Sequence, residues 1–273
     1  MSAWIGPMRG LAIAGLAALV LAGCSGDPEP EVSDTAQPQP QPSISATGPT
    51  GSPEVEIPQV VQQSTIATAV DGAITVYDGV DGGVQQEINA DDVLSVPDST
   101  PLTFLVKSVE DGWLEVYLPI RPNESTGWIP ADSVTLTSTD YRVEIGLDDF
   151  TLTVYEGNDA VVSTPIGVGT DERPTPGGVY YIRELLQPPT DDGPYGPYAY
   201  GLSGYSPVLE TFNGGEAIIG MHGTNDPDSI GEYVSSGCIR MENDVITELV
   251  NDYGLPLGTP VYISEDAAPV TSA

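Results

Sequence analysis

The chain has 273 residues and a formal net charge of −33, with 40 acidic residues, 7 basic residues and one histidine. This acidity argues against nucleic acid or an anionic membrane surface as an electrostatic partner, because both are also negatively charged. The single histidine excludes a His-Glu-x-x-His zinc site. A Ser-x-x-Lys site is excluded because the only lysine, Lys107, follows Phe104 at that spacing. We expect neither a metal nor a cofactor.

The N-terminal segment predicts export from a bacterial cell. Arg9 precedes the apolar run Leu11–Val20, which is too short to be a stable membrane span. Leu21-Ala22-Gly23-Cys24 follows and resembles a bacterial lipobox. We therefore expect residues 1–23 to be a lipoprotein signal peptide and Cys24 to be acylated, which would anchor the protein on the outer face of the cytoplasmic membrane. The alternatives are an ordinary signal peptide and a disulfide between Cys24 and Cys238.

Residues 24–63 are rich in Pro and Gln, with Gln-Pro repeats at 37–42 and no sustained apolar period. This composition predicts a disordered tether, which at about 3.1 Å per residue would reach about 120 Å when extended. Residues 266–273 are predicted to be a frayed tail.

Residues 64–138 predict a small antiparallel β domain. Short runs of β-branched and aromatic residues alternate with turns at Asp71-Gly72 and Asp111-Gly112. The predicted strands are 66–70, 74–77, 102–106, 113–117, 127–129 and 134–136. The phrases around Trp113 and Trp128 resemble a bacterial SH3-like domain, which implies a small barrel that binds wall peptides. The alternative is a spacer that only positions the next domain, since both tryptophans suit a core equally well.

Residues 139–265 predict a second, mostly β domain with one helix. Strands are expected at 141–145, 152–155, 179–182, 217–221 and 260–263, with a turn at Glu156-Gly157-Asn158. Asn243 is expected to cap a helix whose apolar face is Val245, Ile246, Leu249, Val250 and Tyr253, and Gly254 and Pro256 end it. Gln187–Tyr205 is predicted to be a long loop, with Tyr198, Tyr200 and Tyr205 as candidate groove residues.

The stretch Met221–Met241 holds the only histidine and one of the two cysteines. His222 and Cys238 are the one pair available for thiol catalysis, because a thiol ionises too little at neutral pH without a neighbouring imidazole. The glycine before Cys238 leaves room for a substrate carbonyl and for backbone N–H donors. A buried structural cysteine and a satisfied core histidine form the alternative interpretation.

His222-Gly223-Thr224 followed by Ser235-Ser236-Gly237-Cys238-Ile239-Arg240 resembles the signature of the L,D-transpeptidase catalytic domain of the YkuD type. Many members carry His where this chain has Ser236, so any role of that second His is absent here. Thr175-Pro176-Gly177-Gly178, before an aromatic strand, is similar to another segment of the family. The resemblance implies a mostly β fold: an SH3-like barrel, then a β-sandwich-like catalytic domain with a short helix after the catalytic Cys. It also implies that 187–205 forms a lid.

The resemblance assigns roles to individual residues. Cys238 is the nucleophile, His222 is the acid and base, and the carbonyl of Gly223 orients the imidazole. The N–H groups of Gly237 and Cys238 are expected to stabilise the oxyanion. Candidate substrate contacts are Arg240, Ser236 and Tyr205. For Arg240 the alternative is a structural ion pair, and Ser235 and Ser236 are equally expected to shape the loop.

The implied activity is a peptidoglycan L,D-transpeptidase that makes 3→3 cross-links through a Cys thioester, with stem peptides as partners. The alternatives are an L,D-carboxypeptidase on the same site and a non-catalytic, lipid-anchored wall-binding protein. The sequence predicts no oligomeric state.

Overall fold

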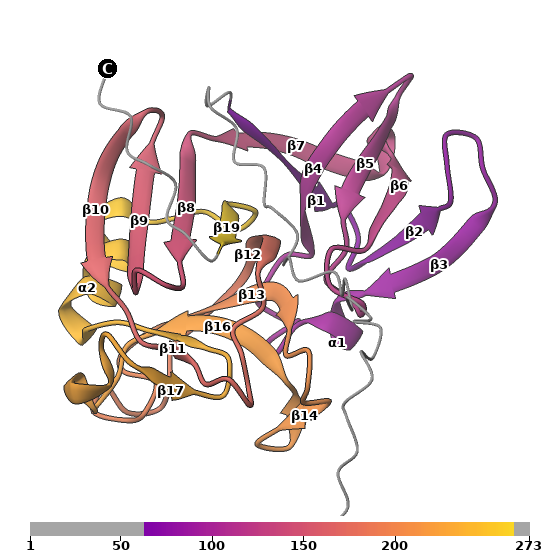
Figure 1. Cartoon of the computed structure of the whole chain (residues 1–273). Helices are drawn as coiled ribbons and strands as arrows, with labels where there is room; N and C mark the ends of the chain where they lie inside the picture. The colour runs from indigo at the N-terminus through magenta and orange to yellow at the C-terminus, as the bar shows by residue number, and fades with distance from the viewer. Residues whose placement is uncertain (1–62, 265–273) are drawn as a thin grey trace, which may run out of the picture. The chain divides into compact units, whose positions relative to one another are not determined.

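The computed structural model describes residues 63–264, which form two β modules with separate cores (Figure 1). The mostly β fold with a short helix after Cys238 is confirmed. The signal peptide, Cys24, nearly all of the tether and the 266–273 tail lie outside the described residues. Within residues 63–264, no helix is long and apolar enough to cross a membrane.

The N-terminal β module is one seven-stranded sheet with the order β3-β2-β6-β5-β4-β1-β7. Its buried core includes Val76, Phe104, Leu114 and Ile129. The predicted Asp111-Gly112 turn joins β4 to β5, and both residues have positive φ, as a tight hairpin requires. The likeness to an SH3-like barrel stays a prediction. The elements are β1 (Ser64–Ala69), β2 (Ala73–Tyr77), β3 (Val84–Asn89), α1 (Ala90–Val93), β4 (Thr103–Glu110), β5 (Trp113–Tyr117), β6 (Thr126–Pro130), a 3₁₀ turn (Ala131–Ser133) and β7 (Val134–Thr139).

The C-terminal β module is built on an eight-stranded sheet with the order β10-β9-β8-β19-β12-β13-β16-β18. Alternating residues of its central strands, such as Tyr180 and Ile182 of β12, enter one buried core. The strands of this sheet are β8 (Tyr141–Gly146), β9 (Thr151–Glu156), β10 (Asp159–Pro165), β12 (Gly178–Leu186), β13 (Ala199–Tyr205), β16 (Ile218–His222), β18 (Ile239–Arg240) and β19 (Pro260–Ser264). Two small ladders lie outside it: β11 (Val168–Gly169) with β17 (Tyr233–Ser235), and β14 (Thr211–Phe212) with β15 (Gly215–Glu216); a 3₁₀ turn covers Pro227–Ser229.

The predicted helix after Cys238 forms, with one correction at its start. α2 (Asn243–Glu248) continues as a π-helical turn, Leu249–Tyr253, and ends at Gly254, whose φ of 59° is left-handed. The expected cap at Asn243 is wrong: Glu242 is the capping residue, and no side chain caps the helix. The Asn243 Oδ1 instead accepts a hydrogen bond from the N–H of Thr224 at 2.8 Å, so this side chain supports the loop after His222.

The predicted long loop is shorter than expected. Residues 199–205 form β13, which pairs with β12 on one side and β16 on the other, so only residues 187–198 connect two strands. The prediction failed because Tyr and Gly in this strand are buried between neighbours and show no apolar alternation. Tyr200 is a core residue whose hydroxyl donates to the carbonyl of Leu249.

Polar contacts join the two modules at the loop between β5 and β6 and at the segment that follows α1. The side-chain amide of Asn123 bonds both the N–H and the carbonyl of Tyr205, at 2.9 and 2.8 Å. The carboxylate of Glu184 accepts from the N–H and the hydroxyl of Ser95, at 2.8 and 3.0 Å. The buried Tyr205 hydroxyl donates to the carbonyl of Pro119 and accepts from Arg183. Most polar groups at the joint therefore have partners, but the Nε of Arg183 is buried without a hydrogen bond.

Asn123→Ala is expected to lower the free energy of unfolding by about 1–3 kcal/mol, because the backbone N–H and carbonyl of Tyr205 lose their partners in a partly buried joint. Urea unfolding of the chain measures this. Asn251→Ala is the matched control, because that exposed side chain makes no hydrogen bond within residues 63–264. Equal losses in the two variants would contradict the role of Asn123.

Candidate active site

Parallel pairing of two short strands brings the histidine to the cysteine. β16 and β18 pair in parallel, with Met221 opposite Ile239 and His222 opposite Arg240. Cys238 immediately precedes β18, and its Sγ lies 3.9 Å from the carbonyl oxygen of Ile218 in β16. The N–H of Met241 also donates to the carbonyl of His222 at 3.0 Å, which fixes this register. Residues 223–237 form the connection that the parallel arrangement requires.

The loop that presents Cys238 is held by hydroxyl groups. The Ser235 hydroxyl donates to the carbonyl of Cys238 at 2.6 Å and accepts from the N–H of Gly237 at 3.0 Å. The Thr175 hydroxyl donates to the carbonyl of Gly237 and accepts from the N–H of Gly169, both at 2.9 Å. These two bonds give the threonine of the Thr-Pro-x-Gly segment a structural role, because Thr175 connects the loop before Cys238 to Gly169 of β11.

Gly237 has a backbone conformation that other residues rarely adopt. Its φ is +116°, and a Cβ placed there would lie 2.8 Å from the Cδ1 of Ile219. The Gly237 N–H, expected to stabilise an oxyanion, is occupied by the Ser235 hydroxyl. Among residues 63–264, no group accepts from the N–H of Cys238, which leaves that donor available at the nucleophile.

The imidazole of His222 is buried and oriented by its own backbone neighbour. Its Nδ1 lies 2.6 Å from the carbonyl oxygen of Gly223, the contact that the resemblance implies. A carbonyl only accepts, so Nδ1 carries the proton and Nε2 presents a lone pair. The ring of Tyr195 packs edge-on against it, with centroids 4.9 Å apart.

Both members of the pair are held neutral. Burial lowers the pKa of His222 to about 4, and the positive charge of Arg240 acts in the same direction. Burial also raises the pKa of the Cys238 thiol above its usual value. Cys238 is a free thiol whose Sγ lies 3.9 Å from the carbonyl oxygen of Ile218. No hydrogen bond joins this sulfur to His222 in the described part of the chain, so the resting site holds a thiol and an imidazole rather than an ion pair.

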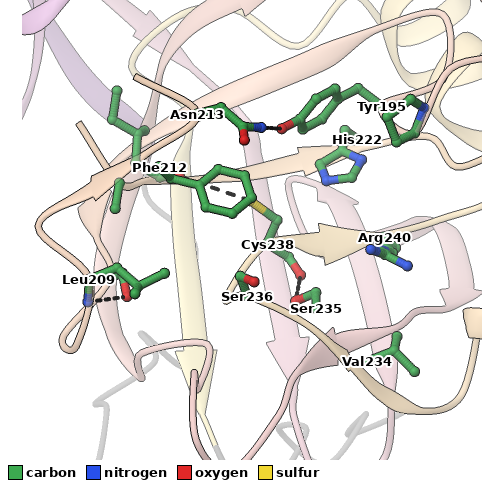
Figure 2. A pocket seen from close by; sticks show the side chains of 14 residues that line it. Tyr195, Leu209, Phe212, Asn213, His222, Val234, Ser235, Ser236, Cys238 and Arg240 are labelled. Atoms are coloured by element: carbon green, nitrogen blue, oxygen red, sulfur yellow. Dashed lines mark hydrogen bonds between the residues drawn. The ribbon is translucent and has the colours of Figure 1, made fainter. Parts of the chain in front are cut away.

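Two cavities meet at the cysteine and the histidine. The smaller, about 220 Å³, is also lined by Arg240, Ser235 and Ser236. The larger, about 640 Å³, extends toward the N-terminal module. Figure 2 shows Phe212, His222 and Cys238 pointing into the smaller cavity, where Asn213 is bonded to Tyr195. Both cavities share Tyr195, Phe212, Asn213, Ile218, His222 and Cys238 in their walls.

The remaining predicted residues lie at different parts of these cavities. Arg240 faces the smaller cavity; its Nε is buried without a hydrogen-bond partner, and its only described ion pair is a long contact of 4.0 Å with exposed Asp226. Ser236 accepts from Arg173 at 3.1 Å. Tyr205 borders the larger cavity with its hydroxyl committed to the joint between the modules. Within residues 63–264, no cluster of three or more His, Cys, Asp or Glu side chains is arranged to hold a metal ion.

Three residues of the site were missed from the sequence: Tyr195, Phe212 and Asn213. A usable signal was present, because Asn213-Gly214 between Phe212 and Gly215 is the favoured pair for a two-residue hairpin. Both residues have positive φ in the structure, 50° and 88°, as such a turn requires. For Tyr195, one of several tyrosines in a Pro- and Gly-rich loop, no comparable signal exists.

The buried neutral histidine predicts a specific acid sensitivity. Unfolded His222 takes up a proton near pH 6.5 and the folded group only near pH 4, so its contribution to stability is complete above pH 6.5 and is lost as the pH falls toward 4. Between pH 7 and pH 4.5 this loss is expected to be about 2–3 kcal/mol. His222→Asn, whose amide nitrogen can occupy the position of Nδ1, should lack that part of the decline. Urea unfolding of both proteins at the two pH values decides, because the carboxylates contribute equally; identical declines would contradict the assigned burial of the imidazole.

Comparisons with known proteins match the second module. Residues 140–263 fit the family model YkuD, the L,D-transpeptidase catalytic domain. The YkuD protein of Bacillus licheniformis, named for L,D-transpeptidase activity, is 38% identical over 124 residues, and that of Bacillus subtilis is 36% identical over 124 residues. The match covers 45% of this chain and 66% of each relative, slightly under two thirds of their length.

A solved structure of the L,D-transpeptidase catalytic domain from E. faecium is 24% identical and covers 46% of this chain and 97% of its own, with a TM-score of 0.35. The matched residues, 140–263, include the paired strands β16 and β18, and with them His222 and Cys238. Residues 140–263 are therefore similar to the L,D-transpeptidase catalytic domain of the YkuD type.

Proposed function

We propose that the chain is a cysteine-dependent peptidoglycan L,D-transpeptidase that forms 3→3 cross-links through a thioester on Cys238. The observation that carries the proposal is that His222 and Cys238 line two cavities, whose walls also share the hairpin residues Phe212 and Asn213. A transferase needs access for both an acyl donor and an acyl acceptor at a single nucleophile.

The first half-reaction forms the acyl-enzyme. The Nε2 of His222 accepts the thiol proton of Cys238 as the sulfur attacks the amide carbonyl of the donor stem. The available N–H of Cys238 is positioned to stabilise the developing oxyanion. The imidazolium then gives its proton to the departing amine of the terminal D-alanine, which leaves a thioester. A lone pair that is basic at neutral pH is needed, and burial keeps His222 unprotonated there.

The second half-reaction transfers the acyl group. The side-chain amine of a neighbouring stem's diamino acid attacks the thioester, His222 takes its proton, and the restored thiol leaves. Water in place of the amine would make the same site an L,D-carboxypeptidase.

Arg240 is proposed to bind a substrate carboxylate in the smaller cavity. Its Nε is an unused donor, and the 4.0 Å contact with exposed Asp226 is easily exchanged for a closer anion. The departing D-alanine carries such a carboxylate next to the bond that breaks. In the cell, we propose that acylated Cys24 anchors the protein on the outer face of the cytoplasmic membrane, where peptidoglycan is the available substrate.

The decisive test is intact-mass analysis of the chain with a disaccharide-tetrapeptide. A product equal to two stems less one alanine is expected, and it should disappear in Cys238→Ala and in His222→Ala. Alanine release without dimer would support the carboxypeptidase instead. Wall binding that persists in Cys238→Ala, with neither product from the native chain, would support the non-catalytic alternative.

Arg240→Ala is expected to raise KM about tenfold or more for a donor with a free terminal carboxylate, because a charged hydrogen bond is lost. The matched control is the same donor with its C-terminus amidated. The native enzyme should prefer the free carboxylate, and the variant should treat the two donors alike. A preserved preference would refute the carboxylate contact.

A further inference from the structure

The catalytic pocket is covered by a hairpin that has little support of its own. β14 and β15 are two residues each and pair only with each other, and their residues are exposed. An isolated two-stranded hairpin is marginally stable in water. The hairpin nevertheless places Phe212 of β14 and Asn213 of the turn in the walls of both cavities. Something outside the hairpin must therefore hold it over Cys238.

The N-terminal module supplies that support through one side chain. The guanidinium of Arg121, in the loop between β5 and β6, donates to the carbonyl oxygens of Ser206 and Leu209, each at 2.7 Å. Its Nε also lies 3.7 Å from the carboxylate of Glu216 at the far end of the hairpin. The guanidinium group stacks over the ring of Tyr205 at 4.9 Å. Arg121 thus contacts both the segment before the hairpin, through Ser206 and Leu209, and its second strand, through Glu216 of β15.

A continuous set of contacts connects the hairpin that Arg121 holds to the imidazole of His222. The hairpin places the Asn213 amide 3.0 Å from the Tyr195 hydroxyl, to which it donates. The Tyr195 ring packs against the imidazole of His222. Phe212 contributes to the same walls as Cys238 (Figure 2).

The same module also lines the larger cavity. Val93, Leu94 and Ser95, at and just after the end of α1, form part of its wall, and the two hydrogen bonds from Ser95 to Glu184 hold them there. A module that acted only as a spacer would need neither to line the larger cavity nor to contact the hairpin through Arg121. A role of the N-terminal module in the site extends the proposed function, and the identity of the substrate rests on that proposed function.

We propose that the N-terminal module completes the active site, and that Arg121 is a positioning residue that holds the β14–β15 hairpin closed over Cys238 and so sets substrate binding. The planar fork of arginine suits the task, because two of its nitrogens reach two carbonyls at once while the third faces Glu216. A lysine at this position could donate to one of these carbonyls only in a less ordered way.

The test compares Arg121→Ala and Arg121→Lys with the native full chain by hydrogen exchange and steady-state kinetics. In Arg121→Ala, peptides from residues 206–217 should exchange about tenfold faster, with β8–β10 unchanged. KM for the stem donor should rise about tenfold while kcat stays within twofold, the factor expected from about 1.4 kcal/mol. Arg121→Lys should recover part of both effects.

Glu124→Gln is the matched control, because Glu124 lies in the same loop and accepts from the N–H of Val179, away from the hairpin. It should leave the exchange of residues 206–217 and KM as in the native chain. The proposal is overturned if Arg121→Ala leaves the hairpin exchange unchanged, if faster exchange leaves KM unchanged, or if Glu124→Gln produces the same changes. Alkylation of Cys238 by iodoacetamide keeps the test independent of the proposed reaction: it should be faster in Arg121→Ala even if the native chain makes no dimer, and an unchanged rate would count against the closed hairpin.

Discussion

The arrangement of the site depends on the parallel pairing of β16 with β18. Two strands of five and two residues would hardly pair alone, but the N–H of Met241 and the reciprocal bonds between Gly167 and Arg240 fasten β18 on both sides. A Cβ at Gly167 would clash with the carbonyl of Ser229, so a glycine here lets the Pro227–Ser229 turn pack against the segment that pairs with Arg240. Cys238 and His222 therefore come from different elements, and their separation is set by the pairing of β16 with β18 rather than by a flexible loop.

Burial decides the resting chemistry of this pair. In an exposed site, an imidazole and a thiol close together would exchange a proton and give a reactive thiolate. Here the low-dielectric surroundings disfavour both charged forms, as the opposite pKa shifts of His222 and Cys238 show. A thiol that stays protonated until substrate arrives is also less prone to oxidation, because oxidants attack the thiolate. The N-terminal module contributes to this burial by supporting the hairpin over the pocket.

The mostly β fold and the candidate pair of His222 and Cys238 could be predicted from the sequence, whereas the contacts around the pair could not. The pair of His222 and Cys238 follows from residue counts and from an ordered motif, and both are local information. Strands with apolar alternation were found, such as Trp113–Tyr117, whereas β3, with the polar run Gln85-Gln86-Glu87, was not. The role of Asn243 was misjudged because a helix-start pattern looks the same whether the side chain caps the helix or holds a distant loop. The hydrogen bonds of Arg121 join residues 85 or more positions apart in the sequence, and no pattern in a single sequence predicts such a contact.

The position of β19 has a consequence for the order in which the protein can fold. This last described strand lies in the middle of the eight-stranded sheet, where it pairs in parallel with β8 and antiparallel with β12. Before residues 260–264 have been synthesised, β10-β9-β8 and β12-β13-β16-β18 are two separate sheets with open edges and half-exposed cores. β16, which ends at His222, and β18, which Cys238 immediately precedes, belong to the second of these. A chain that lacks residues 260–264 therefore already contains His222 and Cys238 but not the strand that joins the two halves of the sheet, so the sheet cannot be completed until those residues are present.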